Sequence, residues 1–165
     1  MNKTIVIYGS STGTCEAIAE KIASKLGCEA VNVQDLSAET VAVNQNLILG
    51  TSTWGAGELQ DDWYDGLKTL RNADLSGKTI ALFGCGDCAS YSDTFVGGIG
   101  ELYNGIKDSG AHFVGAVSTD GYSFDDSEAL VDGKFIGLPL DDVNEDDKTD
   151  SRIDAWIAAI SPAIK

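Results

Sequence analysis

Long apolar runs, basic residues and histidine are scarce in this 165-residue chain. No run approaches the ~20 apolar residues that cross a bilayer, so we expect no membrane-spanning helix. The single histidine, His112, belongs to no metal-ligand pattern, and four cysteines in a chain of this length do not make a disulfide framework. A strand-like run begins at Lys3, which leaves no room for a signal peptide. We therefore expect a reducing, cytoplasmic location.

The charge balance is strongly acidic: 11 basic residues against 26 acidic residues give a net charge of −15. Such a surface repels nucleic acid and anionic membranes, so we expect neither as a partner. Between Ser118 and Asp150 there are eleven acidic residues and two lysines. Acidity can serve solubility alone, but this local excess favours electrostatic steering toward basic patches on partner proteins. We expect the protein itself to be a monomer.

Apolar, β-branched runs alternate with segments of helical periodicity along the whole chain. We expect strands at Lys3–Tyr8, Glu29–Val33, Leu47–Thr51, Thr79–Phe83 and Phe113–Val117. We expect helices at Gly13–Leu26, closed by Gly27, and at Asp62–Leu70, Asp93–Lys107 and Asp150–Ile160, the last with Thr149 as N-cap. This alternation predicts right-handed βαβ crossovers in a doubly wound α/β fold, a parallel sheet with helices on both faces. No linker or repeat divides the chain, so we expect a single domain over residues 1–165.

The stretch Thr119–Leu140 does not follow this alternation of strands and helices. It is long, acidic and punctuated by glycine, with a strand-like piece at Phe135–Leu138. A long insertion in a compact domain is usually functional or a partner surface. An inert excursion that splits the fifth strand is an equally good interpretation of the sequence.

The segment Ser10–Thr14 lies between the first predicted strand and the first predicted helix. Backbone N–H groups and the dipole at a helix N-terminus attract an anion. Hydroxyl side chains add neutral donors, and Gly13 allows close approach of the backbone. No lysine follows the glycine as in a Walker loop, so a permanently bound monophosphate fits better than a triphosphate. A Ser/Thr-rich turn without a ligand has the same composition.

Two aromatic residues, Trp54 and Tyr91, lie in polar segments after the third and fourth predicted strands. Either aromatic alone is more often a packing residue or an interface anchor. In an open α/β sheet, however, such segments gather at the carboxyl ends of the strands, where ligands bind. A phosphate cradle with two aromatic walls for a flat ring indicates flavin mononucleotide (FMN), with Phe95 supporting Tyr91.

These segments resemble the three cofactor loops of flavodoxins: GSSTGT at residues 9–14, STWGAGELQ at 52–60 and GCGDCASY at 84–91. STDGYSF at 118–124 with GKFIGL at 133–138 is similar to the long-chain branch, whose fifth strand is interrupted by an insertion. The resemblance covers essentially the whole chain and implies a five-stranded sheet in the order 2-1-3-4-5, an order carried over from the family. It also implies non-covalently bound FMN and a low-potential one-electron carrier that shuttles between semiquinone and hydroquinone. Its partners would be redox proteins such as a flavodoxin reductase or a 2-oxoacid oxidoreductase.

The resemblance assigns cofactor contacts to three groups of residues: Ser10, Ser11, Thr12, Gly13, Thr14 and Cys15; Thr53, Trp54, Gly55, Ala56 and Gly57; and Cys85, Gly86, Asp87, Tyr91, Thr94 and Phe95. Three positions depart from the family pattern. Thr14 and Cys15 stand where asparagine and then threonine are usual. A thiol is a poor hydrogen-bond donor, so we expect one phosphate contact to be weakened or left to the backbone. Thr94 stands where asparagine is common. We also expect Asp142 and Asn144 near the ribityl chain.

In flavodoxins the peptide that follows the loop tryptophan turns over on one-electron reduction, and the resemblance places it on Gly55. Glycine tolerates the positive φ that this turn requires, so we expect a well-stabilised neutral semiquinone. Carboxylates near the ring would disfavour the second electron and lower the potential. The candidates are Glu58, Asp61, Asp62, Asp87 and Asp93.

Other sequence patterns would indicate different functions, but they agree less well with the sequence than an FMN-binding electron carrier does. Cys85 and Cys88 have CxxC spacing, but without a second pair we expect free thiols. The same stretch matches a dinucleotide fingerprint, yet it follows the fourth strand instead of the first. A flavin-dependent NAD(P)H quinone reductase on the same fold is the alternative function, although Tyr91 should block the flavin face that nicotinamide needs. A phosphorylated receiver domain would need an aspartate where the chain has Gly50 and Thr51. We expect no catalytic residues and no metal.

Overall fold

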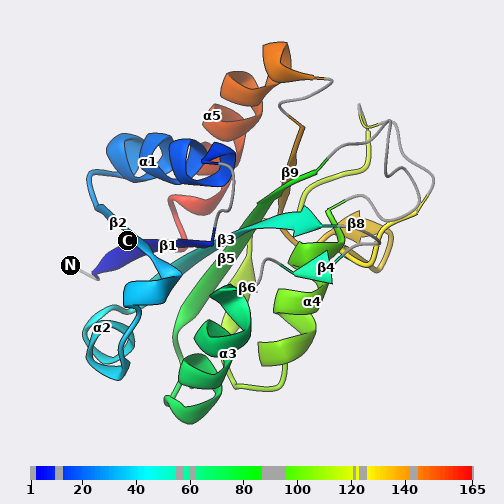
Figure 1. The fold of residues 1–165 in the computed structure, drawn as a ribbon. Coiled ribbons are helices and arrows are strands. Elements are labelled where there is room, and N and C mark those ends of the chain that lie inside the picture. Colours follow the sequence, from blue (N-terminus) through cyan, green and yellow to red (C-terminus); the bar gives the residue numbers. More distant parts are fainter. Residues whose placement is uncertain are drawn as a thin grey trace.

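The computed structural model describes residues 3–9, 13–54, 58–59, 62–86, 96–120, 122, 126–141 and 145–164, with the backbone alone at 52–54 and 58–59. The described chain forms three layers, with a central sheet between two groups of helices (Figure 1). No helix among these residues is both long and apolar enough to cross a membrane.

The sheet is parallel along its main path, in the order β2 (Glu29–Asn32), β1 (Thr4–Gly9), β3 (Asn46–Trp54), β5 (Thr79–Cys85) and β6 (His112–Val114). This is the order 2-1-3-4-5 of the expected α/β fold, which is confirmed. The inner strands are buried on both faces because helices cover both, and they are correspondingly rich in Val, Ile and Leu. A short strand, β4 (Glu58–Leu59), pairs antiparallel with the end of β3.

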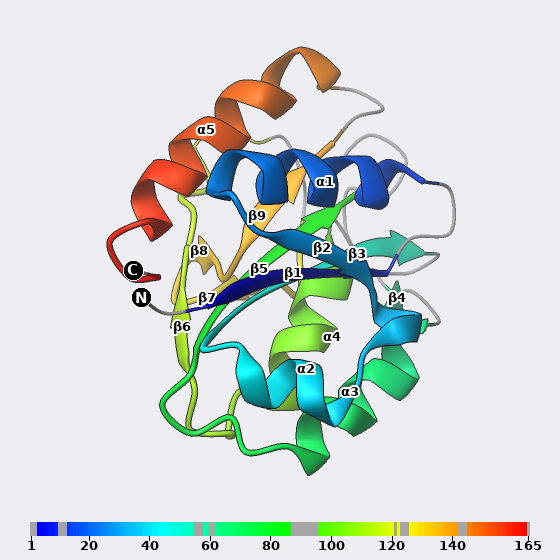
Figure 2. The same cartoon turned by 90° about the vertical axis from the view of Figure 1, so that its left-hand side faces the viewer.

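The helices cover the two faces as Figures 1 and 2 show. On one face lie α1 (Thr14–Leu26) and α5 (Thr149–Ile160), and on the other lie α2 (Ala38–Val43), α3 (Asp62–Asn72) and α4 (Gly97–Ile106). Short 3₁₀ turns lie at η1 (Val33–Asp35) and η2 (Asp146–Lys148).

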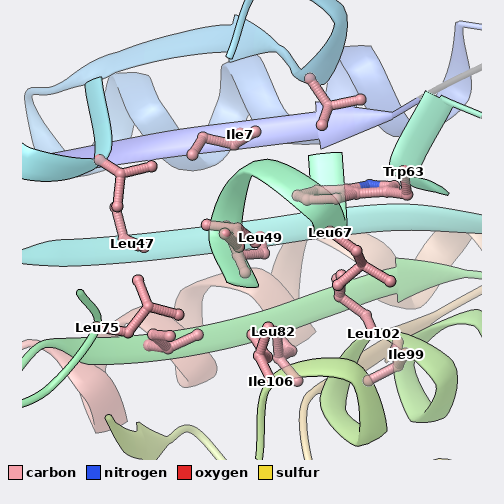
Figure 3. Packing of buried hydrophobic residues seen from close by; sticks show 14 of the residues in the cluster. Ile7, Leu47, Leu49, Trp63, Leu67, Leu75, Leu82, Ile99, Leu102 and Ile106 are labelled. Carbon is pink, nitrogen blue, oxygen red and sulfur yellow. The ribbon is translucent and has the colours of Figure 1, made fainter. Parts of the chain in front are cut away.

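Alternate residues of β1 contribute to the two halves of the core. Ile5 and Ile7 pack toward α2, α3 and α4, where Trp63, Leu49 and Leu82 close the layer (Figure 3). Val6 and Tyr8 pack on the α1 and α5 side. Because these strands are parallel, their carboxyl ends lie at the same edge of the sheet.

The fifth strand is interrupted, as the resemblance implied. β6 pairs with the first half of β5, and β9 (Leu138–Leu140) pairs with its second half. Between them, β7 (Leu130–Val131) and β8 (Lys134–Phe135) form a hairpin of their own. The strand-like piece that we expected at Phe135–Leu138 is thus divided between β8 and β9, because only the second part pairs with β5.

Several predicted boundaries are wrong by a few residues. The fourth helix begins at Gly97 and not at Asp93, because Val96 has φ 46° and stands outside the helix as its N-cap. The last helix takes Thr149 as its first residue, after an N-cap at Lys148. The structure also contains α2, which sequence periodicity does not show because six residues give less than two turns. Gly27, with φ 71°, closes α1 as expected.

Candidate functional site

The carboxyl ends of four strands lie in one row. Gly9 of β1 is paired with Thr51 of β3, Thr51 with Gly84 of β5, and Gly84 with Pro139 of β9. Residues 10–12, 55–57 and 87–95 follow β1, β3 and β5 in the chain, so these three segments start from neighbouring points of one edge. The chain runs from β1 to β2 on one side and returns to β3 on the other. This is the topological switch point where α/β sheets bind ligands.

The structure describes part of the predicted cofactor set. Gly13, Thr14, Cys15, Cys85 and Gly86 are described, as is the backbone of Thr53 and Trp54. The following residues of the predictions lie outside the described part of the chain: Ser10, Ser11, Thr12, Gly55, Ala56, Gly57, Asp61, Asp87, Cys88, Tyr91, Asp93, Thr94, Phe95, Asp142 and Asn144.

The first turn of α1 presents backbone N–H donors at the N-terminus of the helix. Its N-cap is Gly13, whose φ of 89° is left-handed and which has no side chain to cap the helix. The first backbone hydrogen bond runs from the N–H of Ala17 to the oxygen of Gly13, at 3.0 Å. The amides of Thr14, Cys15 and Glu16 precede it and have no acceptor within the helix. Neutral amides at the positive end of a helix dipole suit a phosphate monoester.

The side chain of Cys15 lies in the core and is fully buried. It belongs to the cluster on the α1 face, together with Val6, Tyr8 and Ile18. Its N–H, in contrast, belongs to the first turn of the helix. The effect of this cysteine on phosphate binding therefore stays a prediction, and the structure assigns the thiol to packing.

A contact that sequence reasoning missed lies at the base of the segment 10–12. The hydroxyl of Tyr8 donates a hydrogen bond to Oε1 of Glu16, at 2.9 Å. Burial, the hydrogen bond to Glu16 and the charges of Glu16, Glu20 and Asp35 together raise the pKa of Tyr8 to about 12. The signal in the sequence is a tyrosine at the end of a strand and a glutamate in the first helical turn after it.

The end of β5 is held tightly on both sides. A Cβ on Gly84 would meet Ile99 at 2.6 Å and the oxygen of Thr51 at 3.0 Å. The N–H of Gly86 donates to the oxygen of Leu140, at 2.9 Å, which ties the start of the 87–95 segment to β9. Cys85 is buried at this point. Asp141, also missed from the sequence, follows β9 and is fully buried beside the same edge.

β3 is tied to α3 on one face of the sheet. The indole Nε1 of Trp63 on α3 donates to the oxygen of Gly50, at 2.8 Å, and Trp63 is fully buried. Pairing of Trp54 with Glu58 brings the strands on either side of residues 55–57 together as a hairpin. α3 is thus tied to β3 at Gly50, and β4 packs against α4.

Metal chemistry has no basis in the described part of the chain, where no three His, Cys, Asp or Glu side chains are grouped to hold an ion. A pocket of ≈ 460 Å³ lies beside α5, lined by Val117, Leu138, Arg152 and Trp156 among others. None of the described residues of the three loops lines this pocket.

The fold is that of a doubly wound α/β protein, with its topological switch point at the carboxyl ends of β1 and β3. Residues 6–156 match the flavodoxin family. Flavodoxin 1 of Azotobacter vinelandii is 46% identical over 97% of this chain and 96% of its own length. Flavodoxin of Helicobacter pylori is 44% identical over 97% of both chains. The crystal structure of Fusobacterium nucleatum flavodoxin bound to flavin mononucleotide covers 100% of both chains, with a TM-score of 0.92 and 34% identity.

The chain belongs to the flavodoxin family. The resemblance seen in the sequence is confirmed, including the long-chain type with its interrupted fifth strand.

Proposed function

We propose that this flavodoxin carries single electrons by means of a non-covalently bound FMN, with the whole chain acting as one domain. The observation that carries the proposal is the first turn of α1, which begins at Thr14 after a left-handed Gly13 N-cap and follows β1, whose end lies in one row with residues of β3 and β5. The family assignment and the FMN-bound structures of the Fusobacterium nucleatum protein support it. As a flavodoxin, the protein is an electron-transfer protein and not an enzyme.

The residues present fit FMN, because the cradle contains hydroxyls and amides but no lysine or arginine between Lys3 and Lys21. We assign the phosphate to the amides of Gly13, Thr14 and Cys15 with the hydroxyls of the preceding segment. Trp54 and Tyr91 would flank the ring and exclude water, and Asp142 and Asn144 would contact the ribityl chain. FMN supplies reversible one-electron chemistry when bound. The remaining assigned contacts are Ser10, Ser11, Thr12, Thr53, Gly55, Ala56, Gly57, Cys85, Gly86, Asp87, Thr94 and Phe95.

The acidic surface of the protein favours partner proteins that present a basic face. Flavodoxins exchange electrons with partner oxidoreductases. With a net charge of −15, this one should meet partners through a basic face, such as that of a flavodoxin reductase or a 2-oxoacid oxidoreductase. We place it in the cytoplasm as a monomer. Electron transfer to such a partner should slow as ionic strength rises, because salt screens the attraction.

Acidic residues close to the three predicted cofactor loops also affect the reduction potential of the flavin. Asp62 is half-buried in the first turn of α3, directly after the segment that carries Trp54. Together with Glu58, Asp61, Asp87 and Asp93 it would oppose an added electron, because like charges repel at short range. These charges would lower the reduction potential of the bound flavin, and no side chain would need to take part in the redox chemistry.

The visible spectrum of the purified protein tests the proposal. We expect flavin absorption, loss of FMN fluorescence on addition to the apoprotein, and reduction in two separate one-electron stages. A colourless protein that leaves FMN fluorescence unchanged would contradict it. Incubation with NADPH and a quinone separates the alternative: a carrier shows negligible turnover until a reductase is added, whereas a quinone reductase turns over alone.

A further inference from the structure

Tyr8 and Glu16 lie on either side, in the sequence, of the segment Ser10–Thr14 that is predicted to bind phosphate, and their side chains are in contact. Tyr8 is the last residue but one of β1, where pairing with Asn32 of β2 and Gly50 of β3 holds its backbone from both sides. Glu16 is the third residue of α1 and is exposed to solvent. The 2.9 Å hydrogen bond from the phenol therefore joins a rigid strand to a side chain that would otherwise be mobile.

A glutamate at the third position of a helix has a common alternative. In a capping box its carboxylate reaches back to the backbone N–H of the N-cap. In this structure Oε1 of Glu16 accepts from Tyr8, on the flank of the helix. Two anions cannot share the amides of one helix end without strong repulsion, so a glutamate that capped α1 would compete with a phosphate.

We propose that Tyr8 is a positioning residue that holds the carboxylate of Glu16 away from the amides of α1, leaving them for the phosphate of FMN. The inference rests on the proposed function and names a residue that does not itself touch the cofactor.

The surroundings of the phenol support this role. Glu16 and Glu20 on α1 and Asp35 after β2 act on Tyr8, and with its burial they keep the phenol protonated, with a pKa of about 12. It is thus a constant donor over the working pH range. Lys21, the first cation on α1, is 3.1 Å from Asp150 on α5, so its ammonium group is directed toward α5.

The test compares FMN with riboflavin, which has the same ring but no phosphate, in fluorescence titrations of the apoprotein. Tyr8→Phe should lower the ratio of FMN to riboflavin affinity by about tenfold, roughly 1.4 kcal/mol. Glu16→Ala should raise the ratio, because it removes a negative charge beside the phosphate. Tyr8→Phe added to Glu16→Ala should then change nothing further. Tyr103→Phe, on α4 at the other face of the sheet, is the matched control and should keep the wild-type ratio.

A second readout needs no flavin. Inorganic phosphate should raise the thermal unfolding midpoint of the apoprotein, and Tyr8→Phe should reduce that rise while Tyr8→Phe with Glu16→Ala restores it. Far-UV circular dichroism establishes that each variant is folded. If Tyr8→Phe does not fold, Glu16→Ala still tests the inference, because a ratio that fails to rise in this variant contradicts it.

Three outcomes would overturn the inference: an unchanged ratio in Tyr8→Phe, an equal loss from Tyr8→Phe with and without Glu16, or a lower ratio in Glu16→Ala. Each of these leaves the proposed function intact, since the wild-type protein still prefers FMN. A wild-type apoprotein that binds neither FMN nor phosphate overturns both.

Discussion

The indole Nε1 of Trp156 on α5 donates a hydrogen bond to the backbone oxygen of Gly115, at 2.9 Å. Gly115 follows β6 directly, has φ 89°, and marks the point where the fifth strand is interrupted. A Cβ at this position would meet the same Nε1 at 2.5 Å and Ile160 at 3.0 Å. The bend that begins the insertion is therefore fixed by a side chain of the last helix.

We predict that Gly115→Ala lowers the free energy of unfolding by about 3 kcal/mol, through the left-handed backbone and the contact with a rigid indole. Gly133→Ala is the matched control. Its φ of 81° is similar, but nothing lies within 4 Å of an added Cβ. It should cost only about 1 kcal/mol. Urea denaturation measures both, and equal losses would show that the Trp156 contact contributes nothing.

Trp63 ties α3 to β3 through its hydrogen bond to the oxygen of Gly50. Trp63→Phe should lower the free energy of unfolding by about 3 kcal/mol, because it shrinks a fully buried side chain and removes the indole donor of a carbonyl in the core. Chemical denaturation checks the magnitude. A loss below about 1 kcal/mol would mean that the surrounding core or water replaces the indole without difficulty.

Glu145 should contribute stability that depends on pH. Burial acts to raise its pKa, but hydrogen bonds from Lys148 and Arg152 outweigh this and leave the pKa below its ordinary value of 4.5. A lowered pKa in the folded state gives stability that is present above the unfolded pKa and disappears as the pH falls through the folded one. Arg152, 3.1 Å from Glu145 and 3.9 Å above the ring of Tyr122, links α5 to the insertion through the same group.

The expected result is a difference in unfolding free energy between the wild type and Glu145→Gln that is largest near neutral pH and shrinks below about pH 4. Denaturation at a series of pH values measures it. A difference that grows in acid would show that the ion pair does not hold the carboxylate charged.

Cys15 offers a test of what its side chain does. Because the thiol is buried among apolar side chains, Cys15→Ser should lower the free energy of unfolding by about 1–2 kcal/mol, the cost of burying an unpaired hydroxyl. It should not tighten FMN binding, since the backbone N–H is the same in both. Fluorescence titration measures the affinity, and tighter binding in Cys15→Ser would place the side chain at the phosphate after all.

Local sequence pattern was enough to predict the five strands of the main sheet path and the helices α1, α3, α4 and α5, but not α2. The strand expected at Lys3–Tyr8, the helix expected at Gly13–Leu26 and its closing Gly27 each depend on residues close together in sequence, and each was confirmed. The boundary of α4 was not predicted, because a left-handed Val96 has no composition signal. The contacts of Ser10–Thr12, Tyr91 and the other cofactor residues stay predictions.

The sequence by itself determined a doubly wound α/β chain, its acidic charge and the three segments suited to a phosphate and a flat ring, because periodicity, composition and loop chemistry are local properties. Only the tertiary structure decided that Gly9, Thr51, Gly84 and Pro139 stand in one row, that β6 and β9 share one partner, and that Tyr8 holds Glu16. These depend on strand register and side-chain direction across the fold, and no spacing along the chain fixes either.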